Sequence, residues 1–476
     1  MQYSYRTLFT LSFAFVLFTG LIGCDSFTSG FDEDPTLTTE TSADLLLNSS
    51  LVASILYQDG NHARMAAIFN SQLTGADRQY AGFDSYNVNT SDFDNMWITG
   101  YADVLGDLGV VKEKAQGSND YILGIAQVVE AYTYGTKAAL HGAVPMKQAQ
   151  QGPDNLNPEF TSQMEVYGAV IDRLDTAIST LQSAASGSDV QPTDADIFFS
   201  GNAQQWLEAA HTLKARFLLH MNRPQDAIAA AQNGISNSAN NMMAPHGQTR
   251  GVNSNPFWLF HDIERTGYLQ AANSYAARIL DDRTDSYRGN SKTDESARFG
   301  DYFVGSAGGW DLNTTDGAYF GQRSEYPLVT YRENELIKAE AHLLKSSPDM
   351  SAALTALNSA REAADALYPG EDYYEDYEMG DFQSGGIANP QGESQRRALL
   401  RETLEEKYVS LMAHIEVFND VRRTDNFLNI PPKRGDQLPQ RFLIAQQEIN
   451  ANDNAPQNPP GLFEIPPVNQ FDYPGF

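Results

Sequence analysis

Residues 203–221 read AQQWLEAAHTLKARFLLHM. Apolar side chains recur in this stretch at steps of three and four residues, which is the period of one face of an α-helix. The polar residues between them fall on the opposite face. The stretch therefore predicts an amphipathic helix packed against a core, with an apolar face made by Trp206, Ala210, Leu213, Phe217 and Met221.

A second helix is predicted directly after the first. Pro224 stands where the first turn of a helix tolerates proline, because the N–H that proline lacks has no partner there. The helical pattern continues through residues 227–232, and Gly234 fits a C-terminal cap. Residues 203–234 are therefore predicted to form a helix–turn–helix pair.

The same plan recurs in two other regions. Residues 331–366 contain two helical patterns around a polar turn, and residues 122–140 are predicted to pair with residues 164–181. Alanine-rich helix pairs of this kind resemble tetratricopeptide repeats, whose small residues let paired helices pack closely. The intervals between the pairs are not constant, so we do not expect a regular solenoid. We predict an all-α (mainly α-helical) fold.

One further helix is predicted near the C-terminus. From Leu400 onward, apolar residues continue at steps of four and three as far as Phe418, which predicts one continuous helix. Its apolar face comprises Leu404, Tyr408, Leu411, Ile415 and Phe418.

Three long polar insertions interrupt the helical pattern, near residues 70–100, 236–325 and 367–395. They are rich in Gly, Asn, Asp, Ser, Tyr and Trp. Long polar segments within a folded chain are usually functional or disordered, and the aromatic content favours function. We predict a single domain over residues 46–476, in which the helix pairs pack against this loop-rich, irregular region.

The N-terminus has the features of a bacterial lipoprotein signal. An apolar run over residues 8–18 ends in Leu21-Ile22-Gly23-Cys24, the pattern after which a signal peptidase cuts and lipid is attached to the cysteine. Cys24 is the only cysteine in the chain and cannot form an intramolecular disulfide. We predict a signal peptide over residues 1–23, acylation of Cys24, an acidic tether over residues 24–45 and a location outside the cytoplasm. An ordinary secretory peptide is the alternative.

The net charge of the chain disfavours nucleic acids as partners. The sequence has 32 Lys and Arg residues against 61 Asp and Glu residues, which gives a formal net charge of −29. Such a field repels phosphate backbones, so nucleic-acid binding is disfavoured. The same charge disfavours lying flat on an anionic membrane, and the acyl chains on Cys24 are the expected membrane attachment.

Six groups of residues form a recurring family pattern: 140–145, 158–160, 196–201 with 213–216, 327–331 with 339–341, 406–408 with 418–424, and 439–442. By these groups the chain resembles the SusD/RagB family of outer-membrane nutrient-binding lipoproteins. They follow the order of that family and cover nearly the whole mature chain. Family members often carry an aspartate where His141 or Ala143 stands here, which changes a turn.

The resemblance implies tetratricopeptide-like helix pairs beside an irregular ligand-binding region. It also implies a role at the outer membrane, facing the cell exterior. Such proteins capture oligosaccharides, and in some branches peptides, above a SusC-like TonB-dependent transporter. By this resemblance we expect a non-enzymatic, lipid-anchored binding protein of nutrient uptake.

Aromatic residues among polar neighbours are the candidate ligand contacts. Sugar rings pack on indole and phenol rings, and their hydroxyls need amide, carboxylate or guanidinium partners. Trp310 is the first candidate, because glycines and polar residues surround it. Trp206 is assigned to the core, and Trp97 fits core and platform about equally. The ligand-binding candidates are Trp310, Asp311, Tyr319, Tyr80, Trp97, Arg78 and Tyr86.

The sequence contains no signature of a catalytic centre. It has no Gly-x-Ser-x-Gly elbow, Walker loop or His-Glu-x-x-His motif, and its histidines are scattered. Residues 371–378 read EDYYEDYE and offer oxygen ligands of the kind Ca²⁺ prefers, with a solvated acidic loop as the alternative. We expect no cofactor, with Ca²⁺ in this loop kept open.

Two other functions stay open at this point. One is an extracellular glycoside hydrolase on a helical scaffold, which a chain with 61 carboxylates does not exclude. The other is a tetratricopeptide scaffold that binds only protein. Peptide capture is the alternative ligand within the family.

Overall fold

The computed structural model describes residues 41–470 and Tyr473. From Ala43 onward the described residues belong to one compact unit. The predicted signal peptide, Cys24 and most of the predicted tether lie outside the described residues. The first helix of this unit, α3 (Ala43–Asp59), begins within the last positions assigned to the tether.

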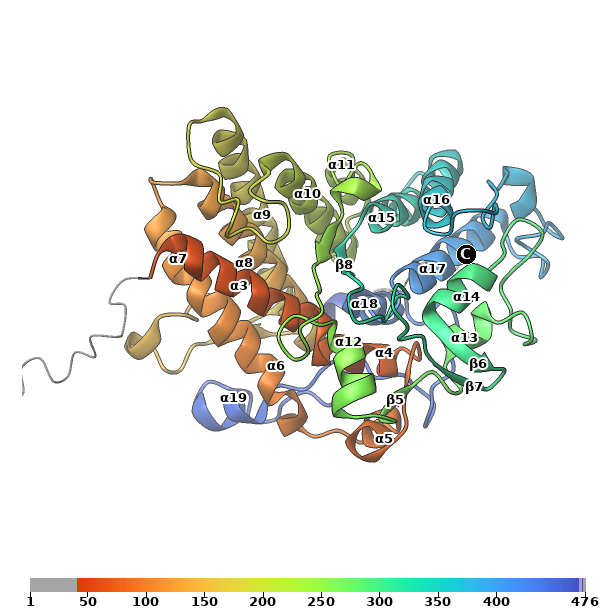
Figure 1. The fold of residues 1–476 in the computed structure, drawn as a ribbon, viewed down its shortest axis with the longest axis horizontal. Helices are drawn as coiled ribbons and strands as arrows, with labels where there is room; N and C mark the ends of the chain where they lie inside the picture. The colour runs from red at the N-terminus through yellow and green to blue at the C-terminus, as the bar shows by residue number, and fades with distance from the viewer. Residues whose placement is uncertain (1–40, 471–472, 474–476) are drawn as a thin grey trace, which may run out of the picture. The chain divides into compact units, whose positions relative to one another are not determined.

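Successive helices pack against one another in pairs. α8 (Asp120–His141) packs on α9 (Gln163–Ser186), α10 (Ala203–His220) packs on α11 (Pro224–Ala231), and α15 (Tyr331–Leu344) packs on α16 (Met350–Asp365). Figure 1 shows α9, α10, α11, α15 and α16 following one another along the upper edge of the view. The three predicted pairs and the mainly α-helical fold class are confirmed.

Local sequence explains where these helices begin. The side chain of Asn202 accepts hydrogen bonds from the first backbone N–H groups of α10, and Ser162 forms a reciprocal capping box with Glu165 in α9. Thr330 caps α15, and Pro224 occupies the first turn of α11. Each cap gives a partner to an N–H group that the helix itself leaves unpaired.

The predicted continuous C-terminal helix is wrong. The chain forms α17 (Gln395–Ser410) and α18 (Ile415–Arg423), separated by a turn over residues 411–414. Ala413 has a φ of 57°, and the side chain of His414 caps α18 by accepting from the Glu416 N–H at 3.0 Å. The Tyr326 hydroxyl donates to the Ala413 carbonyl oxygen at 3.0 Å. Tertiary partners thus replace helical hydrogen bonds and allow the break despite an apolar pattern that runs through it.

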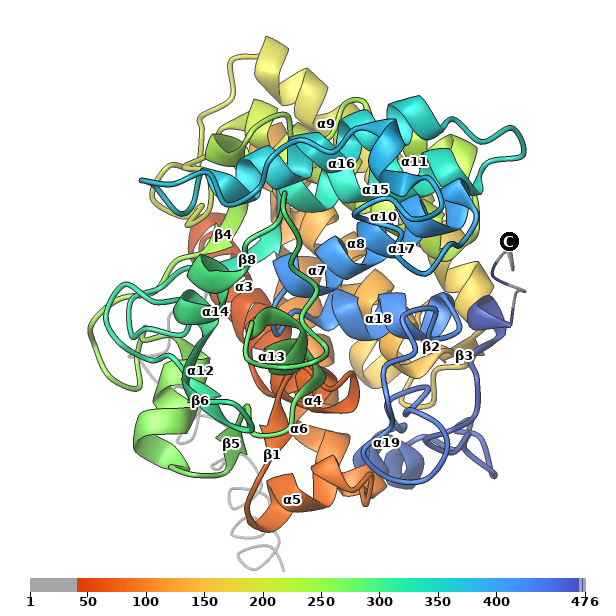
Figure 2. The same ribbon diagram turned by 90° about the vertical axis from the view of Figure 1, so that its right-hand side faces the viewer.

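Short helices and two-stranded pairs organise the insertions. β1 (Thr74–Gly75) pairs antiparallel with β5 (Leu269–Gln270), which joins the first insertion to the second. Figure 2 shows β1 beside β5, above α5 (Arg78–Asp84). The other strand pairs are β2 (Val144–Pro145) with β3 (Phe160–Thr161), β4 (Met242–Ala244) with β8 (Tyr326–Val329), and β6 (Phe303–Ser306) with β7 (Gly309–Leu312).

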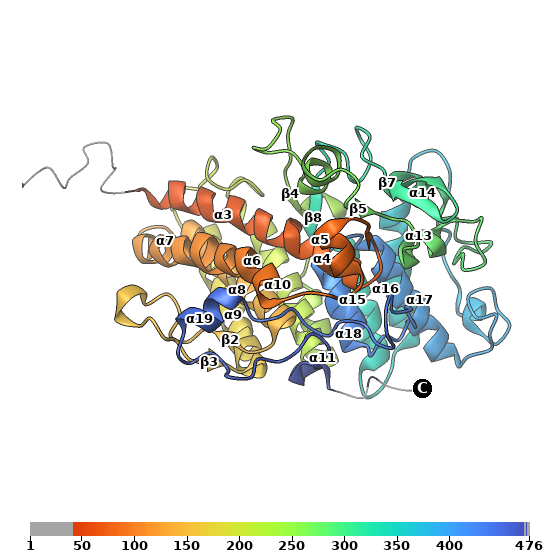
Figure 3. The same cartoon turned by 90° about the horizontal axis from the view of Figure 1, so that it is seen from below.

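The remaining elements connect the pairs or lie within the insertions. Figure 3 shows α3 beside α7 (Asp107–Ala115), with which it packs. The others are α4 (Asn61–Phe69), η1 (Thr90–Phe93), α6 (Asp94–Ile98), η2 (Thr99–Gly106), η3 (Gly152–Asp154), η4 (Ser238–Asn240), α12 (Pro256–Trp258), η5 (Leu259–Glu264), α13 (Tyr275–Leu280), α14 (Ser296–Tyr302), η6 (Met379–Phe382), α19 (Gln446–Ala451) and η7 (Pro467–Asn469).

Buried ion pairs cross-link the apolar core. Arg216 of α10 forms two hydrogen bonds with Glu333 of α15, at 2.5 and 2.7 Å, and both side chains are buried. Arg423 at the end of α18 pairs with Glu340 of α15 at 2.6 Å. These charges are compensated within the core, as burial of an ion requires. None of the helices within the described part of the chain has the length and apolar character needed to cross a bilayer.

Candidate functional site

A hollow of about 400 Å³ lies between the first two insertions, and we call it the polar hollow. One wall comes from α4, α5 and the segment around η1, and the other comes from η5 and the residues that precede β5. The polar hollow is lined by Asn61, Arg64, Gln79, Tyr80, Asn89, Ser91, Asp92, Asn95, Phe260, Glu264, Arg265 and Tyr268.

Close backbone packing and capping set the shape of this site. A Cβ atom at Gly75 would lie 1.9 Å from the carbonyl oxygen of Tyr80, so only glycine lets β1 approach α5 this closely. The side chain of Asn89 accepts from the Ser91 N–H at 3.0 Å, and Asp92 Oδ2 accepts from the Asn89 N–H at 2.8 Å. This capping box holds η1 against the rim of the hollow.

Arg64 organises the inner part of the polar hollow. Its Nε donates to the Tyr80 hydroxyl at 3.0 Å, and that hydroxyl donates to Asn61 Oδ1 at 2.9 Å. The Arg64 guanidinium lies 4.6 Å from the centroid of the Phe260 ring, and the Tyr80 ring also packs on Phe260 at 4.6 Å. A cation, a phenol and an amide are therefore held in one connected arrangement.

The rim of the polar hollow is polar and accessible. Gln79, Asn89, Asn95, Glu264 and Arg265 are exposed, and Gln79 donates to the half-buried Asp92 at 3.2 Å. The ring of Tyr268 is half-buried and lies 6.3 Å from the ring of Tyr80. Amide, carboxylate and guanidinium groups beside a partly exposed aromatic ring are the set that a polyhydroxylated ligand requires.

Of the seven predicted ligand-binding residues, Tyr80 is the one that lines the polar hollow. Arg78 is the first residue of α5, directly before Gln79 in the sequence, with an exposed side chain 3.8 Å from Asp77. Its φ of 45° places it in the left-handed region. Arg78 is thus near the hollow without lining it.

Trp97 and Tyr86 are buried in the structure. The Trp97 indole N–H donates to Glu448 Oε2 at 3.1 Å, and its ring faces the Lys137 ammonium at 4.8 Å. The Tyr86 hydroxyl accepts from the Lys433 N–H at 2.9 Å. Burial raises the pKa of Tyr86 to about 12. Trp97, left open between core and platform by its sequence, packs in the core.

Trp310 differs from the exposed platform that its neighbours predict. It lies on β7 with 3% of its surface exposed, and its indole N–H donates to Asp281 Oδ2 at 2.7 Å. The glycines around it make the β6–β7 turn, while the alternation of the strand turns the indole inward. Asp311, the next residue, points the other way and accepts from His261 Nε2 at 2.9 Å. Contact between a ligand and Trp310 would require the hairpin to open.

Tyr319 lines a different cavity. It is half-buried, its hydroxyl donates to the Met412 carbonyl oxygen at 2.8 Å, and its ring packs on Tyr302. Burial raises the pKa of Tyr319 well above its usual range.

Sequence reasoning missed most of the polar hollow. Tyr268 stands in Arg265-Thr266-Gly267-Tyr268, a polar glycine-containing segment that meets the same criterion as the residues that were chosen. Asn61 and Arg64 lie on α4, outside the predicted insertions, and no local signal marks them. Their place in the site depends on the packing of α4 against α5.

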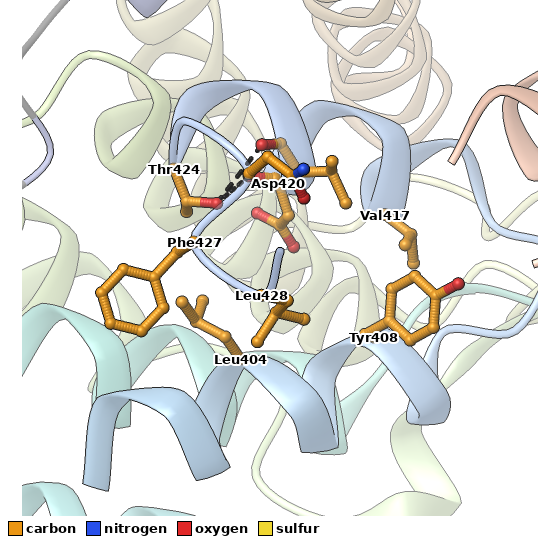
Figure 4. A pocket seen from close by; sticks show the side chains of 9 residues that line it. Leu404, Tyr408, Val417, Asp420, Thr424, Phe427 and Leu428 are labelled. Atoms are coloured by element: carbon orange, nitrogen blue, oxygen red, sulfur yellow. Dashed lines mark hydrogen bonds between the residues drawn. The ribbon is translucent and has the colours of Figure 1, made fainter. Parts of the chain in front are cut away.

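The described residues offer no cluster for a metal ion, and an apolar gap beside α17 is too small for a ligand. Within residues 41–470 and Tyr473, no group of three or more His, Cys, Asp or Glu residues is arranged to hold a metal ion. Figure 4 shows an apolar gap between α17 and the segment after α18, lined by Leu404, Tyr408, Phe427 and Leu428. Its volume is about 10 Å³, which is about the space of one water molecule.

Comparison with known families identifies the chain. Residues 35–443 match the model of the SusD-like family, which is described as starch-binding and associating with the outer membrane. The chain is a SusD-like protein. The match covers most of the sequence and confirms the family inferred from the six residue groups.

Solved structures share the fold of this SusD-like protein. A SusD/RagB family protein from Bacteroides thetaiotaomicron is 20% identical, with a TM-score of 0.65 over 87% of this chain and 95% of that one. A SusD homolog from Bacteroides uniformis is 16% identical, with a TM-score of 0.67 over 91% and 100% of the two chains. A chitin-binding SusD homolog from Flavobacterium johnsoniae is 16% identical, with a TM-score of 0.63 over 86% and 92%. No curated protein sequence matches this chain significantly.

Proposed function

We propose that this SusD-like protein is a non-catalytic surface lipoprotein that binds an oligosaccharide in the polar hollow. The polar hollow itself is the observation that carries this proposal. It places amide, carboxylate and guanidinium groups around a partly exposed tyrosine in a space of about 400 Å³. This volume falls within the usual range for ligand pockets of about 300–1,000 Å³.

The composition of the polar hollow favours a sugar over other ligands. Each sugar hydroxyl donates one hydrogen bond and accepts others, so it suits a surface that mixes Gln79, Asn95 and Asp92 with Arg265. The Tyr268 ring offers a partly exposed face for the C–H groups of a sugar ring. The family description as starch-binding and the chitin-binding homolog support the same ligand class.

Calorimetry against neutral oligosaccharides from starch and chitin, and against a peptide panel, tests the ligand. Tyr268→Ala removes the stacking face, and we expect it to weaken glycan binding about fivefold, since an aromatic contact contributes about 1 kcal/mol. Tyr373→Ala is the matched control, because Tyr373 is also half-buried but lies outside the polar hollow. Equal affinities of the wild type and Tyr268→Ala would argue against this site. Binding of peptides alone would favour peptide capture.

We further propose that acyl chains on Cys24 anchor the protein at the outer membrane, facing the exterior, and that it delivers its ligand to a SusC-like TonB-dependent transporter. The pattern of residues 21–24 and the family description support this location. Mass spectrometry of the membrane fraction should find an acylated N-terminus that Cys24→Ser abolishes. Co-purification of a large transporter with the wild type is the expected result, and recovery of only other partners would contradict delivery.

A further inference from the structure

A second cavity, of about 490 Å³, lies between the second insertion and the α15–α16 pair. We call it the Arg332 cavity. It shares no lining residue with the polar hollow. Its walls come from β4, the end of α14, the segment before β8, the start of α15 and the residues after α16, and the side chains used below are Asp301, Tyr319, Glu325, Arg332 and Tyr368.

One donor of the Arg332 guanidinium has no hydrogen-bond partner. Arg332 is the second residue of α15, and 9% of its surface is exposed. Its Nη1 is buried without a hydrogen bond, and its charge acts on the Asp301 carboxylate from beyond ion-pair distance. Other buried arginines of the chain, such as Arg216 and Arg423, are paired with carboxylates. An unpaired buried donor is costly. Because Nη1 has almost no accessible surface, a ligand in the cavity would reach this guanidinium through its other nitrogen atoms.

Acceptors and aromatic walls surround the unpaired donor. Asp301 lines the same cavity, and its carboxylate accepts from the Tyr319 N–H at 2.8 Å and from the Tyr368 hydroxyl at 3.4 Å. Asp301 does not reach Arg332 closely enough to form an ion pair. The half-buried rings of Tyr319 and Tyr368 line the same cavity.

We propose that the Arg332 cavity is a second ligand site, which binds one neutral sugar unit by its hydroxyl groups. A hydroxyl can accept from Arg332 while a neighbouring hydroxyl donates to Asp301, and the tyrosine rings cover the apolar faces of the sugar ring. The volume of about 490 Å³ is large enough for one sugar unit. The choice of a sugar as the ligand rests on the proposed function, whereas the assignment of the Arg332 cavity as a site does not.

The charges of the cavity favour a neutral ligand over an anionic one. Asp301 and the exposed Glu325 line the cavity together with Arg332, so the lining carries two carboxylates against one guanidinium. The whole chain carries a formal charge of −29. The Arg332 guanidinium would attract a ligand carboxylate, but Asp301 and Glu325 would both repel it. A neutral hydroxyl can accept a hydrogen bond from the same guanidinium and is not repelled by the two carboxylates.

Ligand-detected saturation-transfer NMR on the purified chain from Cys24 onward tests this site. The probes are methyl α-D-glucopyranoside and N-acetyl-D-glucosamine as neutral sugars and D-glucuronate as the anion. We expect millimolar binding of at least one neutral probe, weakened about tenfold or more by Arg332→Met, because a hydrogen bond from a charged donor is lost. Arg223→Met, which removes an exposed arginine of the helix pairs, is the matched control and should bind as the wild type does.

Tyr268→Ala separates this proposal from the proposed function. It removes a wall of the polar hollow and should leave Arg332-dependent monosaccharide binding unchanged. Neutral probes that bind Arg332→Met and wild type equally would overturn the second site, and so would tighter binding of glucuronate than of both neutral sugars. If Arg332→Met does not fold, Asp301→Asn decides the matter, since it keeps the shape of the cavity and removes the charged acceptor. Unchanged binding by Asp301→Asn would also refute the proposal.

Discussion

The imidazole of His261 joins η5 to β7 through Asp311. Its Nε2 lies 2.9 Å from Asp311 Oδ1, and its Nδ1 lies 2.6 Å from Asp262 Oδ1. Phe260 and Glu264, which line the polar hollow, lie on the same short helix as His261. This contact therefore holds one wall of the proposed glycan site against the β6–β7 hairpin.

This contact predicts a pH dependence of stability. Burial lowers the pKa of His261, but hydrogen bonds and charges from Asp311 and Asp262 outweigh it and raise the pKa above 6.5. Protonated His261 therefore stabilises the folded state fully below pH of about 6.5, and this contribution is lost as the pH rises through the folded pKa. We expect the melting temperature to fall as the pH rises above 6.5, and to fall less in His261→Asn.

Proton NMR checks the same prediction at the residue itself. The His261 resonance should titrate above pH 6.5 in the wild type and at a lower pH in Asp311→Asn, because that change removes one carboxylate charge. A His261 that titrates at or below 6.5 in the wild type would contradict the role assigned to Asp311.

The Arg216–Glu333 pair predicts a large loss of stability when one partner is removed. Arg216→Met leaves Glu333 buried and uncompensated between α10 and α15, which should cost about 3–5 kcal/mol in the free energy of unfolding. The double variant Arg216→Met, Glu333→Leu should recover much of this loss, since no buried charge is left unpaired. Denaturant unfolding measures both, and a double variant as unstable as the single one would count against this explanation.

Trp310 should act in stability rather than in ligand binding. Trp310→Phe keeps an aromatic ring but removes the indole donor, so Asp281 Oδ2 loses one partner. We expect a loss of about 1–3 kcal/mol in unfolding free energy and no change in glycan affinity for the folded fraction. Thermal unfolding and calorimetry on the same preparation provide the measurement, and a drop in affinity at unchanged stability would restore Trp310 as a ligand contact.

Two helical glycines should respond to alanine with opposite signs. A Cβ on Gly135 of α8 would lie 2.2 Å from the buried Phe217 ring of α10, so Gly135→Ala should cost about 1–3 kcal/mol by overpacking. Gly168 of α9 has no atom within 4 Å of the corresponding position. Gly168→Ala should therefore stabilise the protein by about 0.5–1 kcal/mol, by lowering the entropy of the unfolded chain. Similar melting temperatures for the two variants would show that α8 and α10 are less closely packed.

The sequence predicts one residue of the polar hollow. Tyr80 is predicted as a ligand contact because polar residues surround a phenol in the first insertion, and it lines the polar hollow. Trp310 meets the same criterion and lies outside the hollow. Both rings are buried, with 4% and 3% of their surfaces exposed, because strand alternation and packing against distant segments cover them whatever their local composition.

The continuous helix predicted through residues 411–414 was wrong for a related reason. The apolar steps from Leu404 to Phe418 are helical, and they continue across the turn. The carbonyl groups released there accept from Tyr319 and Tyr326, which are distant in sequence. Hydrophobic periodicity records which residues are buried, and it carries no information on such partners.

The sequence by itself determined the helix pairs and the family, because apolar spacing and short motifs involve positions close together along the chain. The C-terminal cap of α11 lies at Gln232, two residues before the predicted Gly234. Tertiary structure alone decided which aromatic rings are covered, where the last long helix breaks, and that α4 and η5 meet around Tyr80. It also left Nη1 of Arg332 without a hydrogen bond beside a cavity. These outcomes depend on contacts between residues tens to hundreds of positions apart, which no local pattern encodes.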